Sequence, residues 1–204
     1  MARNLNPKCK QCRRIKEKLF LKGERCISAK CTLLKKNYFP GIHGAKQTRA
    51  KTSEYGRQLC EKQKVKKIYG ILERQFRNYF QKAAKKKGET GEILLRSLEM
   101  RLDSVIYNVG LVRSRDKVRQ LITHGFFLVN DKKVNVPSYK VKVKDIIRIG
   151  KENKKWQEEG SKNELPLWLS FDIKKGIIKI LSEPQKEYLP QNINTRLIVE
   201  SYSK

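Results

Sequence analysis

The sequence predicts an α+β fold in which a four-cysteine segment precedes a mainly helical domain and a small helix-helix-strand module. Three observations predict it. Four cysteines cluster before residue 32, apolar side chains then recur at three- and four-residue steps as far as Val109, and β-branched runs with polar turns follow between residues 127 and 149. The 204 residues suffice for one or two domains with hydrophobic cores.

The N-terminal residues 1–45 are predicted to form a metal knuckle. Four of the five cysteines follow the pattern C-x2-C-x13-C-x4-C, in which each close pair can present two thiolates to one ion. They are Cys9, Cys12, Cys26 and Cys31. Four thiolates favour structural zinc, and an iron–sulfur cluster, which uses the same ligands, stays open as the second occupant. Disulfides are disfavoured because the N-terminus has no apolar secretion signal and an intracellular chain is expected.

A basic loop and long helical segments are expected next. Residues 39–51 are rich in glycine and basic side chains, which predicts an extended loop lying on a partner. Ser53 is expected to cap an amphipathic helix whose apolar stripe runs from Val65 to Ala83 and which ends at Gly88. A further helix is expected between residues 91 and 110, where apolar residues again follow helical spacing.

The stretch 101–149 predicts helices followed by strands. One helix should begin after Ser114 and stop at Gly125, a hairpin with a polar turn at residues 130–131 follows, and another strand is expected over residues 141–149. Basic side chains cluster at the start of this helix and on the hairpin. At the helix start, backbone N–H groups add positive potential that favours phosphate. The basic side chains are Arg113, Arg115, Lys117, Arg119, Lys132 and Lys133.

The net charge indicates the kind of partner. Lysine and arginine number 48 against 20 acidic residues, which gives +28, and +26 of this excess lies within residues 1–150. Such a charge disfavours compactness unless a polyanion neutralises it, and nucleic acid fits because bound phosphates release counterions. Arg13 and Arg14, beside the second cysteine, are expected on the same polyanion. No apolar run approaches the ~18 residues of a membrane span, so no membrane partner is expected.

Several segments together resemble one family. Residues 101–149 are similar to the small RNA-binding module first defined in small ribosomal subunit protein four, which some pseudouridine synthases and tyrosyl-tRNA synthetases also carry. Four other segments resemble the bacterial-type, zinc-knuckle form of that ribosomal protein, so that the resemblance covers essentially the whole chain. They are MARNLNPKCKQCRR, SEYGRQLCEKQKVKKIYGILERQFRNYF, GETGEILLRSLEMRLDSVIYNVG and INTRLIVESYSK.

The resemblance implies a structural constituent of the small subunit in the cytoplasmic ribosome, not an enzyme. Family members bind small-subunit rRNA early, nucleate assembly of the subunit body, contact neighbouring ribosomal proteins and affect accuracy where mRNA enters. The implied domains are 1–45, 46–98 completed by 161–204, and 99–160. Zn2+ is the implied cofactor and no small-molecule substrate is expected. The RNA contacts should be mostly to phosphates. Basic residues matched outside the module are Arg49, Lys51 and Arg57.

Two other classes of protein could share some of these features. An RNA-modifying enzyme could carry the same module, but such an enzyme needs a catalytic domain, and the chain after residue 150 is short and contains no histidine. A metal-stabilised DNA-binding regulator would need a recognition helix for the major groove and usually a symmetric dimer. Duplex DNA displacing folded RNA from the protein would favour that class.

Overall fold

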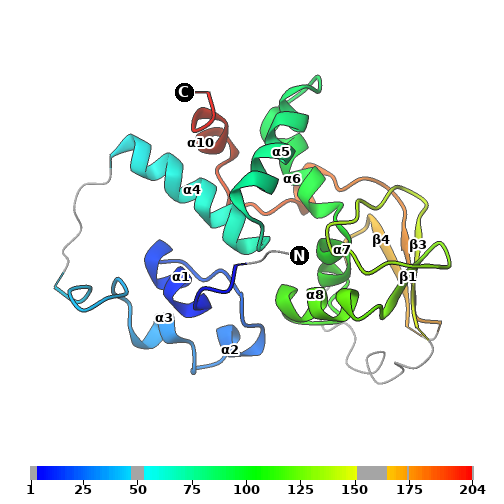
Figure 1. Ribbon diagram of the computed structural model, residues 1–204, viewed down its shortest axis with the longest axis horizontal. Coiled ribbons are helices and arrows are strands. Elements are labelled where there is room, and N and C mark those ends of the chain that lie inside the picture. Colours follow the sequence, from blue (N-terminus) through cyan, green and yellow to red (C-terminus); the bar gives the residue numbers. More distant parts are fainter. Residues whose placement is uncertain (1–3, 47–52, 151–164, 174, 204) are drawn as a thin grey trace. The chain divides into compact units, whose positions relative to one another are not determined.

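The computed structural model describes residues 4–46, 53–150, 165–173 and 175–203 (Figure 1). The chain divides into two compact units, one formed by residues 1–91 with 191–204 and the other by residues 92–190. The predicted contact residues Arg49 and Lys51 lie outside the described residues, as does the end of the predicted basic loop.

The first unit begins with three short helices, α1 (Lys8–Ile15), α2 (Glu24–Ile27) and α3 (Thr32–Lys35). Helices of four to eight residues are not stable on their own in water, so packing must hold them. α1 contacts both α3 and the long helix α4 (Glu54–Ile68). Between the short helices the buried apolar side chains are Leu19 and three of the cysteines.

The sequence predicted one continuous helix through residues 65–83, and this is wrong because the structure has two helices there. Ser53 caps α4 as predicted, because its Oγ accepts a hydrogen bond from the Gly56 N–H at 3.1 Å. α4 stops where Gly70 takes a φ of 59°, and α5 (Glu73–Ala84) starts only after an extended Leu72. A left-handed residue ends the helical path, and glycine adopts that conformation without a steric penalty.

The C-terminal tail completes the first unit. α10 (Thr195–Glu200) packs on α4, and the Tyr202 ring stacks on Phe80 of α5 with 4.4 Å between centroids. The tail is also tied at Lys64, a buried lysine whose Nζ lies 2.5 Å from the Asn192 carbonyl oxygen and 2.6 Å from Glu17. Segments far apart in the sequence are therefore joined through α4.

The second unit starts with α6 (Thr90–Glu99), most of which belongs to it, followed by α7 (Leu102–Asn108) and α8 (Arg115–Thr123). One continuous helix was predicted for residues 91–110, and this is wrong as well. The break falls at Arg101, whose extended backbone forms an isolated antiparallel bridge with Lys140. A tertiary pairing overrides the helical periodicity there.

An antiparallel five-stranded sheet forms the rest of the second unit. Its strands are β1 (Phe127–Val129), β2 (Lys132–Lys133), β3 (Ile146–Ile149), β4 (Leu169–Asp172) and β5 (Ile177–Ile180), in the order β2-β1-β3-β5-β4, and the short 3-10 helix η2 (Lys186–Tyr188) follows. α7 and α8 cover one face of this sheet (Figure 1), where Phe127, Val129, Ile147 and Ile178 are buried with the apolar side chains of both helices.

Three features of the sheet bear on the predictions. The hairpin turn is as predicted, with positive φ at Asn130 and Asp131, which matches the twist of a tight two-residue turn. The strand predicted over residues 141–149 shrinks to Ile146–Ile149. β4 and β5 were not predicted, and because β5 pairs with β3 they join this unit, whereas residues 161–204 were all assigned to the helical domain.

Candidate nucleic-acid interface

The four clustered cysteines converge on one pocket in the first unit. Cys9 and Cys12 lie on α1, Cys26 lies on α2 and Cys31 precedes α3, and all four line a pocket with Leu19 and Phe20. Burial raises the pKa of the Cys12 thiol, and the charges of the other three cysteines raise it further.

The pocket suits a cation by its chemistry, but it is not a finished coordination sphere. Its charged lining residues are all basic, so no carboxylate competes with the sulfurs. In the part of the chain that the structure describes, no group of three or more His, Cys, Asp or Glu side chains is arranged to hold a metal ion. The donor set therefore suits a soft, thiolate-bound metal by its chemistry, although the side chains are not arranged as a metal site.

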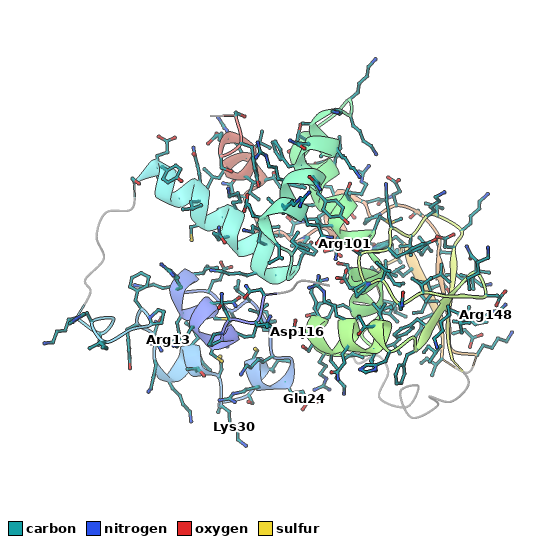
Figure 2. All side chains as sticks on the ribbon, viewed as in Figure 1. Arg13, Glu24, Lys30, Arg101, Asp116 and Arg148 are labelled. Carbon is teal, nitrogen blue, oxygen red and sulfur yellow. The ribbon has the colours of Figure 1, made fainter. Side chains whose placement is uncertain are left out.

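Arg13 is built into the knuckle. Its Nε and Nη2 donate to the carbonyl oxygens of Tyr38 and Phe39, each at 3.0 Å, and its guanidinium lies 4.5 Å from the centre of the Tyr38 ring. Figure 2 shows Arg13 on α1, beside the cysteine-bearing helices. This side chain, predicted to contact RNA, fastens the segment that follows α3 to α1.

Arg14 and Arg57 are both exposed, on α1 and at the start of α4. Lys67 of α4 is half-buried, and its pKa is lowered first by burial and then by the charge of Arg14. Two of the residues predicted to contact RNA thus lie on the surface of the first unit.

The basic residues at the start of α8 fall into two sets. Arg113 and Lys117 are exposed, whereas the side chains of Arg115 and Arg119 are 15% and 12% exposed. Arg115 Nη1 donates to Ser104 Oγ at 2.8 Å, and its guanidinium lies 4.3 Å from the centre of the Tyr107 ring. The sequence predicted RNA contacts for all four, whereas in the structure two of them are exposed and two are mostly buried in internal contacts.

A buried ionic cluster lies beneath α8. Asp103, only 3% exposed in its side chain, accepts from Arg101 Nη2 at 2.9 Å and from Arg119 Nε at 2.8 Å. Burial alone would raise the pKa of Asp103, but the two guanidinium groups hold that pKa below its ordinary value. Glu99, equally buried, accepts from Asn108 at 2.6 Å and lies 3.8 Å from Arg115. These acids were missed in the sequence, although buried carboxylates within an apolar helical stripe signal such partners.

The hairpin carries Lys132 and Lys133, both exposed. The aliphatic chain of Lys133 runs over Gly125, where an added Cβ would lie 2.1 Å from Lys133 Cε. Gly125 also has a φ of +75°, so the glycine ends α8 and leaves room for the lysine.

These features define a basic RNA-binding protein with a helix-helix-strand module, and the comparisons agree. Residues 3–99 match the family described as "Ribosomal protein S4/S9 N-terminal domain", and residues 100–147 match the "S4 domain".

The chain belongs to the family of small ribosomal subunit protein uS4, whose members are structural, rRNA-binding components of the ribosome and not enzymes. It is 48% identical over 212 residues to "Small ribosomal subunit protein uS4" of Nitrosospira multiformis, with both chains covered in full. It is 49% identical over 210 residues to the protein of that name from Acetivibrio thermocellus, and 49% identical over 209 residues to uS4A of Clostridium botulinum, again with full coverage. Its place is the cytoplasmic ribosome. No helix among the described residues is both long and apolar enough to span a membrane.

Proposed function

We propose that this protein binds small-subunit rRNA at an early stage of assembly and nucleates the subunit body. The observation that carries the proposal is the construction of α8, whose exposed Arg113 and Lys117 stand at a helix start that buried acids fix from below. Backbone N–H groups and two cations at one helix N-terminus are an arrangement that suits RNA phosphates.

The basic residues at α8 and on the hairpin have two different roles. Arg113, Lys117 and Lys132 contact phosphates, whereas Arg115 and Arg119 position the helix through Ser104, Glu99 and Asp103. In the first unit, the exposed Arg14 and Arg57 contact further phosphates. The contacts are dispersed over the backbone, as expected for folded RNA that is recognised by shape.

The experiment is a binding titration of the full-length protein with a helix-junction fragment of small-subunit rRNA at several salt concentrations. Lys117→Ala should lower the slope of log K against log salt by about 0.7–0.9, because one phosphate contact is lost. Arg119→Lys should destabilise the protein and leave that slope unchanged. No binding of the wild-type protein at moderate salt would overturn the proposal.

We also infer that the protein neighbours other small-subunit proteins near the point where mRNA enters, and contributes to accuracy there. The support is membership of the family. The test is photo-crosslinking in intact small subunits, with a message that carries 4-thiouridine at successive positions downstream of the decoding site. Crosslinks to this chain are expected, and their absence at every position would refute the inference.

We propose that Cys9, Cys12, Cys26 and Cys31 bind Zn2+, with an iron–sulfur cluster as the second candidate. The support is the ligand spacing, the common pocket and the mutual repulsion at Cys12. The metal would remove that repulsion by binding thiolates and would supply folding energy to three helices that are too short to be stable alone.

Metal analysis of the purified protein tests this proposal. The variant with Cys9→Ser and Cys12→Ser should lose stoichiometric metal, whereas Cys60→Ser should keep it, because Cys60 lies on α4 and does not line the pocket. The second unit should still fold in both variants. A wild-type protein without stoichiometric zinc or iron would end the proposal.

A further inference from the structure

Phe20 lies in the segment between α1 and α2 in a conformation that bulky residues avoid. Its φ is 50°, in the left-handed region, where a non-glycine residue other than Asn or Asp is uncommon. Its ring is 48% exposed, whereas the adjacent Leu19 is only 5% exposed. Neither the backbone conformation nor the exposure of an aromatic ring stabilises the folded protein, and such strain clusters at functional sites.

Hydrogen bonds to cysteine sulfurs flank Phe20 in the sequence. The backbone N–H of Leu19 donates to the Cys12 sulfur, and the N–H of Lys22 donates to Cys26 Sγ at 3.3 Å. Hydrogen bonds to sulfur therefore fix the chain on both sides of Phe20. Phe20 lines the pocket and, being exposed, does not fill the core.

The other two aromatic rings of the knuckle are already occupied. The guanidinium of Arg13 lies over Tyr38, and the ammonium of Lys16 lies 4.4 Å from the centre of the Phe39 ring. Among the described residues, no cation and no second ring is paired with Phe20. Among the described residues of the knuckle, Phe20 is thus the aromatic ring that has no internal partner.

Basic side chains share the pocket with Phe20. Lys18, Lys22 and Arg25 line the same pocket, and Lys22 and Arg25 are exposed. Lys30 projects from the same cysteine-bearing segment in Figure 2. An aromatic face with cations close by is how proteins hold unpaired nucleotides, since the ring stacks on the base and the cations contact the adjacent phosphates.

We propose that Phe20 stacks on an unpaired base of small-subunit rRNA, while Lys22 and Arg25 contact the flanking phosphates. This inference rests on the RNA binding proposed above and adds a base contact to a surface otherwise directed at phosphates. The basic side chains that line the same pocket favour a nucleotide over an apolar segment of a protein.

The experiment compares ring deletions in the full-length protein bound to full-length small-subunit rRNA. Phe20→Asn removes the ring and keeps the left-handed backbone, which asparagine tolerates. It should weaken binding about 5- to 150-fold, the range for loss of one base–aromatic stack. The salt slope should stay unchanged, because no phosphate contact is removed, whereas Arg25→Ala should reduce it.

Two further variants make the test specific. Ile27→Ala is the matched control, because Ile27 is 68% exposed on α2 and is another apolar side chain of the knuckle. It should bind like wild type. Phe20→Trp should retain affinity, and RNA should quench its added fluorescence when a base stacks on the indole.

Each result decides the matter. Binding by Phe20→Asn within twofold of the Ile27→Ala control, or Phe20→Trp fluorescence unaffected by RNA, would overturn the stacking site. Loss of metal or of helical circular dichroism in Phe20→Asn, together with Phe20→Trp unaffected by RNA, would show a structural role only and would also overturn it. If every variant and the wild type fail to bind RNA, the proposed function itself fails.

Discussion

Asp103 holds the second unit together through two guanidinium groups, and replacing it tests that role. The carboxylate is 3% exposed and lies between Arg101, whose side chain is 1% exposed, and Arg119. Asp103→Ala removes the buried carboxylate that both guanidinium groups contact. Removing one partner of a buried ion pair typically costs about 3–5 kcal/mol, since the remaining charge stays desolvated.

The magnitude can be read from urea unfolding. With an m-value of about 2 kcal/mol/M, a loss of about 4 kcal/mol lowers the midpoint by about 2 M. Asp103→Asn keeps the shape and one acceptor oxygen, so a smaller loss is expected. The matched control is Asp131→Asn, which also removes a carboxylate paired with an arginine, but on the surface, where Asp131 is 69% exposed beside Arg148. That change should cost no more than about 1 kcal/mol, and asparagine tolerates the left-handed backbone at this site.

The same carboxylate gives a pH dependence with a definite sign. Because the folded pKa of Asp103 lies below its ordinary value, the stabilisation is fully present above the unfolded pKa near 3.8 and is lost as pH falls through the lower folded pKa. Stability of Asp103→Asn should therefore fall less steeply in this acid range than stability of the wild type. Equal midpoints for Asp103→Ala and Asp131→Asn would refute the claim that the buried cluster supports α8.

Two further changes probe single contacts. The Tyr202 hydroxyl donates to Glu73 Oε1 at 2.8 Å, so Tyr202→Phe should cost about 1 kcal/mol in thermal unfolding. Glu73 is half-exposed; burial would raise its pKa, but hydrogen bonds from Lys66 and Tyr202 lower that pKa to about 2. The contribution of Glu73 to stability is thus lost as the pH falls from 4.5 to about 2. An unaltered acid transition in Tyr202→Phe would count against the contact. Gly125→Ala should cost about 1–2 kcal/mol by urea unfolding, because its φ of +75° disfavours a Cβ. Rescue by adding Lys133→Ala would instead attribute that loss to the crowded lysine chain.

Local signals in the sequence predicted some elements well. The capping hydroxyl of Ser53 and the turn at Asn130 and Asp131 act within a few residues, and both are where the sequence places them. The cysteine spacing likewise brings four side chains to one pocket. The helical spacing of apolar residues gave a wrong prediction where a distant segment sets the backbone conformation. At Arg101 the backbone is extended and pairs with Lys140, which interrupts the predicted helix.

The C-terminal strands show the same limit. β4 and β5 are four residues each, too short for alternation to separate them from a helix turn. β4 pairs with β5, and β5 pairs with β3, which lies about 30 residues earlier in the sequence. The family resemblance suggested that the tail returns to the helical domain. In the structure the segment from residue 191 onward, which carries α10 and Tyr202, belongs to the first unit, and β4 and β5 belong to the second.

Net charge alone could not distinguish the cations that face RNA from those that hold the fold. Arg13, Arg101 and Arg119 each direct a planar fork of donors at internal carbonyl or carboxylate oxygens. An ammonium group cannot reproduce this bidentate geometry, which is why arginine occupies these positions in a chain that otherwise uses more lysine. The number of phosphate contacts is therefore smaller than the 48 basic residues, and exposed cations such as Lys117 and Lys132 should set the salt dependence of binding.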